Sequence, residues 1–97
     1  KVKFAQYWVL NVIRNVDALD YENTTWNRKH TKEKDEYPLL NILNPVFRKE
    51  KLVGIDILRL RIGLETGTTI YISHGLKSLL EKNKATRGVW FGKIRVL

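Results

Sequence analysis

Residues 52–72, with the sequence LVGIDILRLRIGLETGTTIYI, decide the fold that we expect for this chain. The first part, residues 52–64, is rich in Ile, Leu and Val, and a second extended pattern follows at residues 69–72. Gly67 stands in the polar stretch between them and can take the positive φ that a tight connection needs. Two such runs around a glycine-containing turn predict a β-hairpin whose turn lies at residues 65–68.

The sequence after the hairpin predicts a helix and a strand. Ser73 can cap the helix, because a serine side chain accepts a hydrogen bond from a free backbone N–H in the first turn. Leucines at helical spacing predict its buried stripe, and they are Leu76, Leu79 and Leu80. Residues 88–97 are apolar and aromatic enough to predict a final strand.

The sequence before the hairpin predicts two more helices. Apolar residues recur at three- and four-residue steps over residues 5–19, which favours a helix, although their Val and Ile content also fits a strand. Residues 35–44 predict a short helix with Pro38 in its first turn. The predicted fold class is therefore α+β: a small antiparallel sheet, made of the hairpin 52–72 and the C-terminal strand 88–97, packed against two to three helices.

The chain length of 97 residues predicts one small domain spanning residues 1–97. Within it, residues 20–36 are polar and almost free of aliphatic side chains, so we expect a mobile loop there. Trp26 lies in the middle of this loop. It either anchors the loop on the core or stands exposed as a contact residue.

The charge of the chain is its strongest compositional feature. Eighteen Lys and Arg residues against ten Asp and Glu residues give a formal net charge of +8. Residues 1–47 hold seven basic and six acidic side chains, whereas residues 48–97 hold eleven basic and four acidic ones. A field of this sign favours polyanions, so nucleic acid is the partner that the charge suggests, although many basic surfaces only keep a protein in solution.

Strand alternation strengthens the hypothesis of a non-enzymatic domain that binds single-stranded DNA or RNA. If the hairpin and the terminal strand share one sheet, its outer face gathers cations and aromatic rings, on which bases stack while phosphates pair with the cations. The predicted face holds Arg59, Arg61, Tyr71, Phe91, Lys93 and Arg95. The polar loop adds Arg28, Lys29 and Lys32 as a basic arm. Duplex DNA is the weaker variant of this hypothesis.

A protein-interaction or assembly module is the alternative. Val53, Ile55 and Ile57 lie on the same side of the predicted strand as Arg59, so the first half of that strand is apolar on both faces. The strand at residues 93–97 could pair with a partner chain or with a second copy in a homodimer.

Enzyme chemistry has little support in the sequence. There is no cysteine, and neither His30 nor His74 has a metal-ligand partner at short helical spacing. The acidic clusters at residues 17–22 and 33–36 do not lie on converging rigid elements, as a metal nuclease requires. We expect no catalytic residue, no metal and no cofactor. No apolar run approaches the ~18 residues that span a bilayer, and no signal peptide is recognisable, so we expect no membrane contact and an intracellular protein of the cytoplasm, nucleus or nucleoid.

Overall fold

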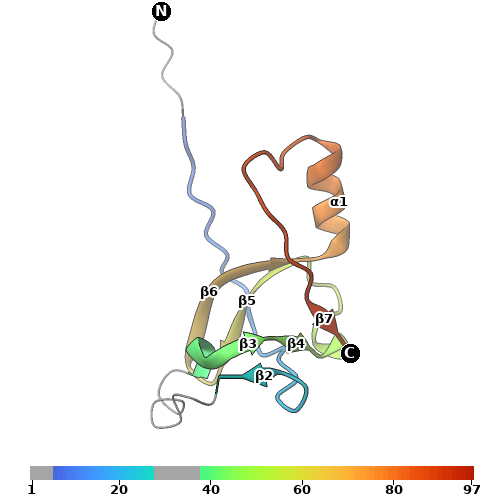
Figure 1. Ribbon diagram of the computed structural model, residues 1–97. Coiled ribbons are helices and arrows are strands. Elements are labelled where there is room, and N and C mark those ends of the chain that lie inside the picture. Colours follow the sequence, from blue (N-terminus) through green and yellow to red (C-terminus); the bar gives the residue numbers. More distant parts are fainter. Residues whose placement is uncertain (1–5, 28–37) are drawn as a thin grey trace, which may run out of the picture.

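The computed structural model describes residues 6–27 and 38–97, and it arranges them as short strands with a single α-helix (Figure 1). The elements in chain order are β1 (Asn15–Val16), β2 (Thr25–Trp26), the 3-10 turn η2 (Pro38–Asn41), β3 (Ile42–Asn44), β4 (Val46–Phe47), the 3-10 turn η3 (Lys49–Lys51), β5 (Ile57–Ile62), β6 (Glu65–Ile72), α1 (His74–Lys82) and β7 (Arg95–Val96).

The hairpin predicted over residues 52–72 is present, but its turn lies earlier than predicted. β5 ends at Ile62 and pairs with Glu65 at the start of β6, so Gly63 and Leu64 alone make the connection. Gly63 has a φ of 58°, which the first position of a type II′ turn demands and which glycine alone adopts without strain. Gly67, to which we assigned the turn, lies inside β6 instead.

Strand β6 carries extra residues relative to β5, and this bends the hairpin. The register runs from Arg59 opposite Ile70 to Arg61 opposite Thr66, so β6 has more residues than β5 in this interval. Extra residues on one strand form a bulge, which bends the strand and increases its twist. The strong curve of β6 is visible in Figure 1.

The helix predicted over residues 5–19 is wrong for the described residues of that segment. Residues 6–14 are extended, and β1 lies parallel to β5 with Asn15 opposite Arg59, giving a sheet of order β1-β5-β6. The β-branched and aromatic residues that supplied the apolar helical pattern favour a strand, because their side chains lose rotamer freedom in a helix.

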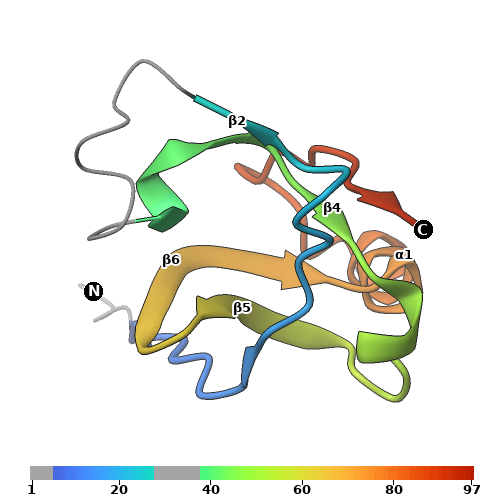
Figure 2. The same cartoon turned by 90° about the horizontal axis from the view of Figure 1, so that it is seen from below.

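Two further sheets of two strands each lie opposite the hairpin (Figure 2). β2 pairs antiparallel with β3, and β4 pairs parallel with β7. The final strand is thus limited to residues 95–96 and joins β4, not the hairpin, through backbone hydrogen bonds from Leu97 N to Phe47 O (2.9 Å) and from Lys49 N to Leu97 O (2.8 Å). Of the helix predicted at 35–44, the described part forms η2 and then β3.

The core lies between these layers and is small. Its fully buried residues come from β4, β5 and the segment after β1, and they are Ala18, Leu19, Phe47, Leu58 and Leu60. Leu58 and Leu60 alternate with outward-facing arginines, as the pattern of β5 predicted. A core drawn from three separate segments is held by contacts between residues far apart in the sequence.

Helix α1 begins where the sequence predicted, but it covers no core. Ser73 is its N-cap and accepts a hydrogen bond from Leu76 N at 3.1 Å. No residue of α1 is buried, and Leu79 is more exposed than covered. The predicted packing of a sheet against two to three helices is therefore contradicted: the described residues hold one α-helix, and strands and irregular segments make up the rest.

Half of the predicted loop at residues 20–36 has a definite structure. Thr24 is buried, and its hydroxyl oxygen accepts a hydrogen bond from Val46 N at 3.1 Å. Trp26 packs against the core, donates its indole N–H to Tyr21 O at 3.2 Å and stacks on the Tyr21 ring. Trp26 thus anchors this segment. Residues 28–37 lie outside the described part of the chain, so the mobility of the loop there stays a prediction.

Candidate protein-binding surface

The six residues predicted to form one basic and aromatic face are divided among several parts of the structure. Arg59 and Arg61 do face away from the core on β5, opposite to Leu58 and Leu60. Arg28, Lys29 and Lys32, the predicted basic arm, lie outside the described residues. The remaining four residues of the face do not join the two arginines.

Tyr71 lies on the core side of the hairpin. It pairs with the buried Leu58 across the ladder, and directly paired residues share a face. Its ring meets the Phe47 ring edge-on, with 4.9 Å between centroids. Burial raises the pKa of the Tyr71 hydroxyl above its ordinary value of 10.0, while a hydrogen bond with Thr69 acts in the opposite sense. Tyr71 is therefore a core residue, and Ile70 takes the outward place beside Arg59.

Phe91, Lys93 and Arg95 lie in the C-terminal segment, outside the hairpin sheet. Phe91 is half-buried, and Lys77 Nζ of α1 stands 5.4 Å from its ring centroid. Arg95 belongs to β7 and pairs with Val46, while Lys93 is exposed just before that strand. The six residues do not share one sheet face, because β7 pairs with β4, a long-range pairing that strand alternation cannot reveal.

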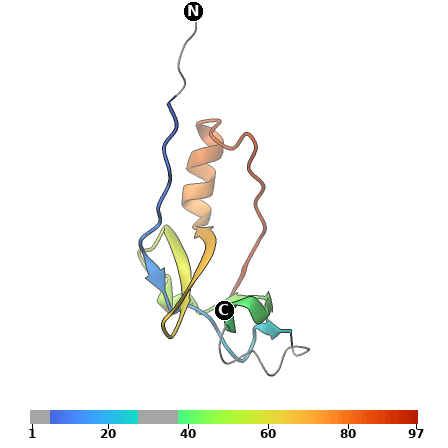
Figure 3. The same ribbon diagram turned by 90° about the vertical axis from the view of Figure 1, so that its left-hand side faces the viewer.

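Five exposed apolar or aromatic side chains lie in the segment 6–14, which we call the arm. It leaves the base of β1 as an extended chain and runs away from the small sheets, toward the same end of the molecule as α1 (Figures 1 and 3). Tyr7, Trp8 and Val9 are 91%, 90% and 91% exposed. Ile13 is exposed as well, whereas Val12 is buried and fixes the base of the arm.

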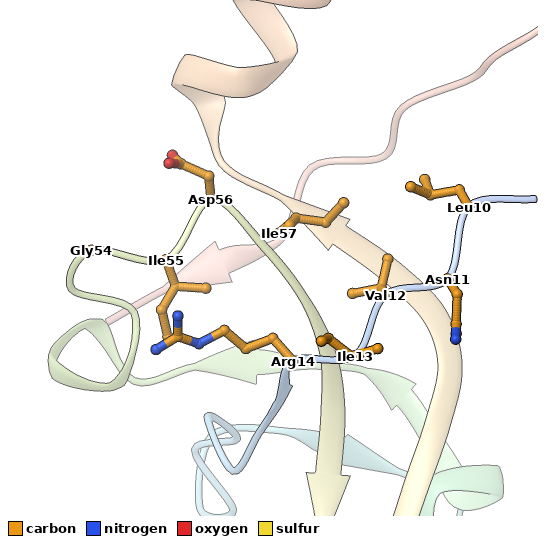
Figure 4. Close-up of a pocket in the computed structure, with 9 residues that line it drawn as sticks. All are labelled: Leu10, Asn11, Val12, Ile13, Arg14, Gly54, Ile55, Asp56 and Ile57. Carbon is orange, nitrogen blue, oxygen red and sulfur yellow. The ribbon is translucent and has the colours of Figure 1, made fainter.

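The base of the arm forms one wall of a groove of about 360 Å³, and residues 54–57 form the other. Figure 4 shows its lining: Leu10, Asn11, Val12, Ile13, Arg14, Gly54, Ile55, Asp56 and Ile57. The Arg14 side chain extends toward Ile55, and the Asp56 carboxylate points away from the arm. Val53 lies just outside this lining and is 81% exposed. The apolar residues that we assigned to an assembly surface, Val53, Ile55 and Ile57, therefore adjoin the arm.

Arginines border this surface on β5 and at the base of the arm. Arg59 N donates to Arg14 O at 2.8 Å, which brings the two backbones together. The Nε atom of Arg59 is shielded from solvent and has no hydrogen-bond partner among the described residues. Arg14 and Arg59 thus place positive charge beside the groove, which favours an acidic group on a partner.

A second, larger hollow of about 1320 Å³ opens between the hairpin and the layer of β3, β4 and the C-terminal segment. Phe47, Leu58 and Leu60 form its floor, and Trp90 stands at its margin with 87% of its surface exposed. Figure 2 shows the two layers that enclose it. This hollow is the incompletely filled centre of the fold, because its floor is the core itself.

Within the described ranges, no group of three or more His, Asp or Glu side chains is placed to hold a metal ion. The adjacent Ser73 and His74 do not form a nucleophilic pair, since the Ser73 hydroxyl donates to Asp56 Oδ1 at 2.7 Å and caps α1. Among the helices described, none has the length and apolar composition for a membrane span.

Sequence reasoning missed the arm as an exposed surface. The helix predicted over residues 5–19 would place Trp8, Val9 and Ile13 on its buried side, because they recur at three- and four-residue steps with the other apolar residues. The composition was the signal that pointed elsewhere: seven consecutive residues, YWVLNVI at 7–13, include one polar side chain, and most favour strands. An extended segment with apolar side chains on both faces needs a neighbour on each side, and residues 6–27 and 38–97 supply one only at the base of the arm.

A model of the Immunity protein family (Imm11) matches residues 1–96 of the chain. No curated protein and no solved structure matches it. The family match contradicts the hypothesis of a nucleic-acid-binding domain and of nucleic acid as the partner, because an immunity protein family implies a role in toxin immunity and not nucleic-acid binding. It agrees better with the alternative of a protein-interaction module.

Proposed function

We propose that this chain protects against a bacterial toxin by binding the toxin protein, because the chain belongs to the Imm11 immunity protein family. Immunity proteins typically bind a cognate toxin protein. The protection then depends on occupying a surface of the toxin, and we propose that it requires no catalysis by the chain. An intracellular site of action stays a prediction from the sequence.

The observation that carries the proposal is the exposure of the arm. Several large apolar side chains that are exposed to water along one segment mark a binding surface in a folded protein. Trp and Tyr are the residues that most often dominate binding energy at protein interfaces, and Trp8 and Tyr7 are adjacent here. Val53, at 81% exposure beside the arm's groove, extends the same apolar surface.

The charge of the chain indicates what kind of toxin surface fits the arm. The net charge is +8, and Arg14, Arg59 and Arg61 lie at the base of the arm and on the adjoining strand. Complementary potentials steer two proteins together and exclude wrong partners. We therefore propose an acidic toxin surface with an apolar centre.

The test is protection in bacteria followed by binding of the purified proteins. The chain is co-expressed with each candidate toxin of the bacterium that encodes it, and the toxin whose killing is suppressed is purified for calorimetry. We expect Trp8→Ala to weaken the complex about 30-fold or more, the loss typical of a central aromatic contact. Protection should fall in parallel.

Trp90→Ala is the matched control. It removes an equally exposed tryptophan from the C-terminal segment, at 87% against 90% exposure. We expect its affinity to stay within about threefold of the parent, as for most residues outside a binding centre. The reverse ranking would move the interface to the C-terminal segment. Failure to suppress any candidate toxin would overturn the proposed function itself.

A further inference from the structure

The arm has apolar residues on both of its faces. Successive side chains of an extended segment point to opposite sides, so Tyr7, Val9 and Ile13 lie on one face and Trp8 and Leu10 on the other. All five are exposed. A strand that covers a protein surface needs one apolar face only, whereas a strand that is covered on both faces is apolar throughout. The arm has the composition of a strand inside a core.

The backbone of the arm is also open to pairing. Within the described ranges, Arg14 O is the single backbone group of residues 6–14 in a hydrogen bond, accepting from Arg59 N. The parallel ladder sets Asn15 opposite Arg59 and Val16 opposite Leu60. Continued toward the N-terminus, this register reaches the start of β5 at Ile57 after two more residues. Residues 7–12 therefore extend past the end of their own sheet.

We infer that the arm binds its partner by strand insertion: residues 7–13 pair along the edge of a sheet in the toxin protein, and apolar side chains of the toxin cover both faces. This inference rests on the proposed function and specifies how the toxin is held. Main-chain hydrogen bonds supply part of the affinity in such complexes, and the alternating side chains fill pockets on either side.

The charges around the arm specify the edge that it fits. Lys1 and Lys3 precede the apolar run in the sequence, and Arg14 follows it. A sheet edge with Asp or Glu side chains at both ends of its apolar stretch matches this arrangement, because opposite charges across a strand pair stabilise it. A second copy of the chain does not match it, since two copies bring together the same cations and a charge of +8 each.

Proline substitutions test the strand directly, because proline removes a backbone N–H yet is compatible with an extended chain. Neighbouring N–H groups of a strand point to opposite edges. We therefore compare Leu10→Pro with Leu10→Ala and Asn11→Pro with Asn11→Ala, in the full chain, against the purified toxin from the protection assay. One of the two proline variants should bind at least about tenfold more weakly than its alanine partner, the loss expected for main-chain ladder bonds left unmade. The other pair should differ little.

Hydrogen exchange gives the second readout. Backbone amides of residues 7–13 should exchange rapidly in the free chain, and about half of them should become protected in the complex, because alternate N–H groups face the toxin edge. Strand insertion would be overturned if each proline variant bound the toxin as tightly as its alanine partner while the chain still bound the toxin through Trp8. The proposed function would then still stand. A different result would assign the arm to a second copy of the chain. In that case these amides would already be protected in the free chain, and sedimentation would show a dimer that either proline substitution dissociates.

Discussion

Ser73 ties the two ends of the hairpin to the start of α1. Its backbone N–H donates to Asp56 O at 2.8 Å, and its hydroxyl donates to Asp56 Oδ1 at 2.7 Å. The same hydroxyl oxygen accepts the hydrogen bond from Leu76 N that caps the helix. Ser73, the residue after β6, thus bonds both to Asp56, the residue before β5, and to the first turn of α1.

Ser73→Ala should lower the free energy of unfolding by about 1 kcal/mol, the usual cost of losing an N-cap side chain. Helical circular dichroism should also decrease, because α1 has no buried residue to hold it in place. Urea unfolding monitored at 222 nm measures both effects. Ser78→Ala is the control, since Ser78 is exposed in the same helix and alanine has the higher helix propensity. If Ser78→Ala lowered the free energy of unfolding as much as Ser73→Ala does, the loss could not be attributed to the N-cap.

Helix α1 is an element with little packing to support it. Besides the Ser73 cap, its contacts include an exposed ion pair from Lys77 Nζ to Glu81 Oε1 at 2.9 Å and the contact of the same ammonium with the Phe91 ring. Exposed ion pairs of this spacing contribute only about 0.3–0.5 kcal/mol. The central strand β5, by contrast, has neighbours on both edges and buries Leu58 and Leu60.

This difference predicts two levels of hydrogen-exchange protection in the free chain. Amides of residues 78–82 in α1 should be protected at least about tenfold less than amides of β5, because the helix can open without exposing the core. Native-state exchange at low denaturant, read by mass spectrometry or NMR, measures both in one experiment. Equal protection would show that α1 unfolds only with the core and that a surface not seen in the monomer covers it.

The whole molecule is long for its size and strongly charged. Its Cα radius of gyration is 16.2 Å, whereas a compact domain of this length has about 12.5 Å. The arm and α1 account for the length, since both extend from the same end of the layered core (Figure 3). Because the molecule is elongated, the electrostatic field of its net charge of +8 extends well beyond the layered core.

Association with an acidic toxin should therefore be steered by charge. We expect the association rate to fall at least about tenfold between 50 and 500 mM NaCl, while the dissociation rate, which reports the apolar contacts of the arm, changes much less. Stopped-flow measurement with the toxin from the protection assay gives both rates. An association rate that does not depend on salt would rule out the proposed acidic surface of the toxin, but it would not contradict the apolar contact of Trp8.

The sequence by itself determined the local features of this protein: a hairpin within residues 52–72, the inward alternation of Leu58 and Leu60, and a helix that starts after Ser73. Each follows from short-range periodicity or from one capping residue. The tertiary structure alone decided that Tyr71 faces the core, because the turn at Gly63 sets the register and a shift of one residue exchanges the faces of a strand. It likewise decided that β7 joins β4 and that the arm finds no partner along most of its length among the residues that the structure describes. These outcomes depend on pairing between distant segments, which the pattern along one strand does not encode.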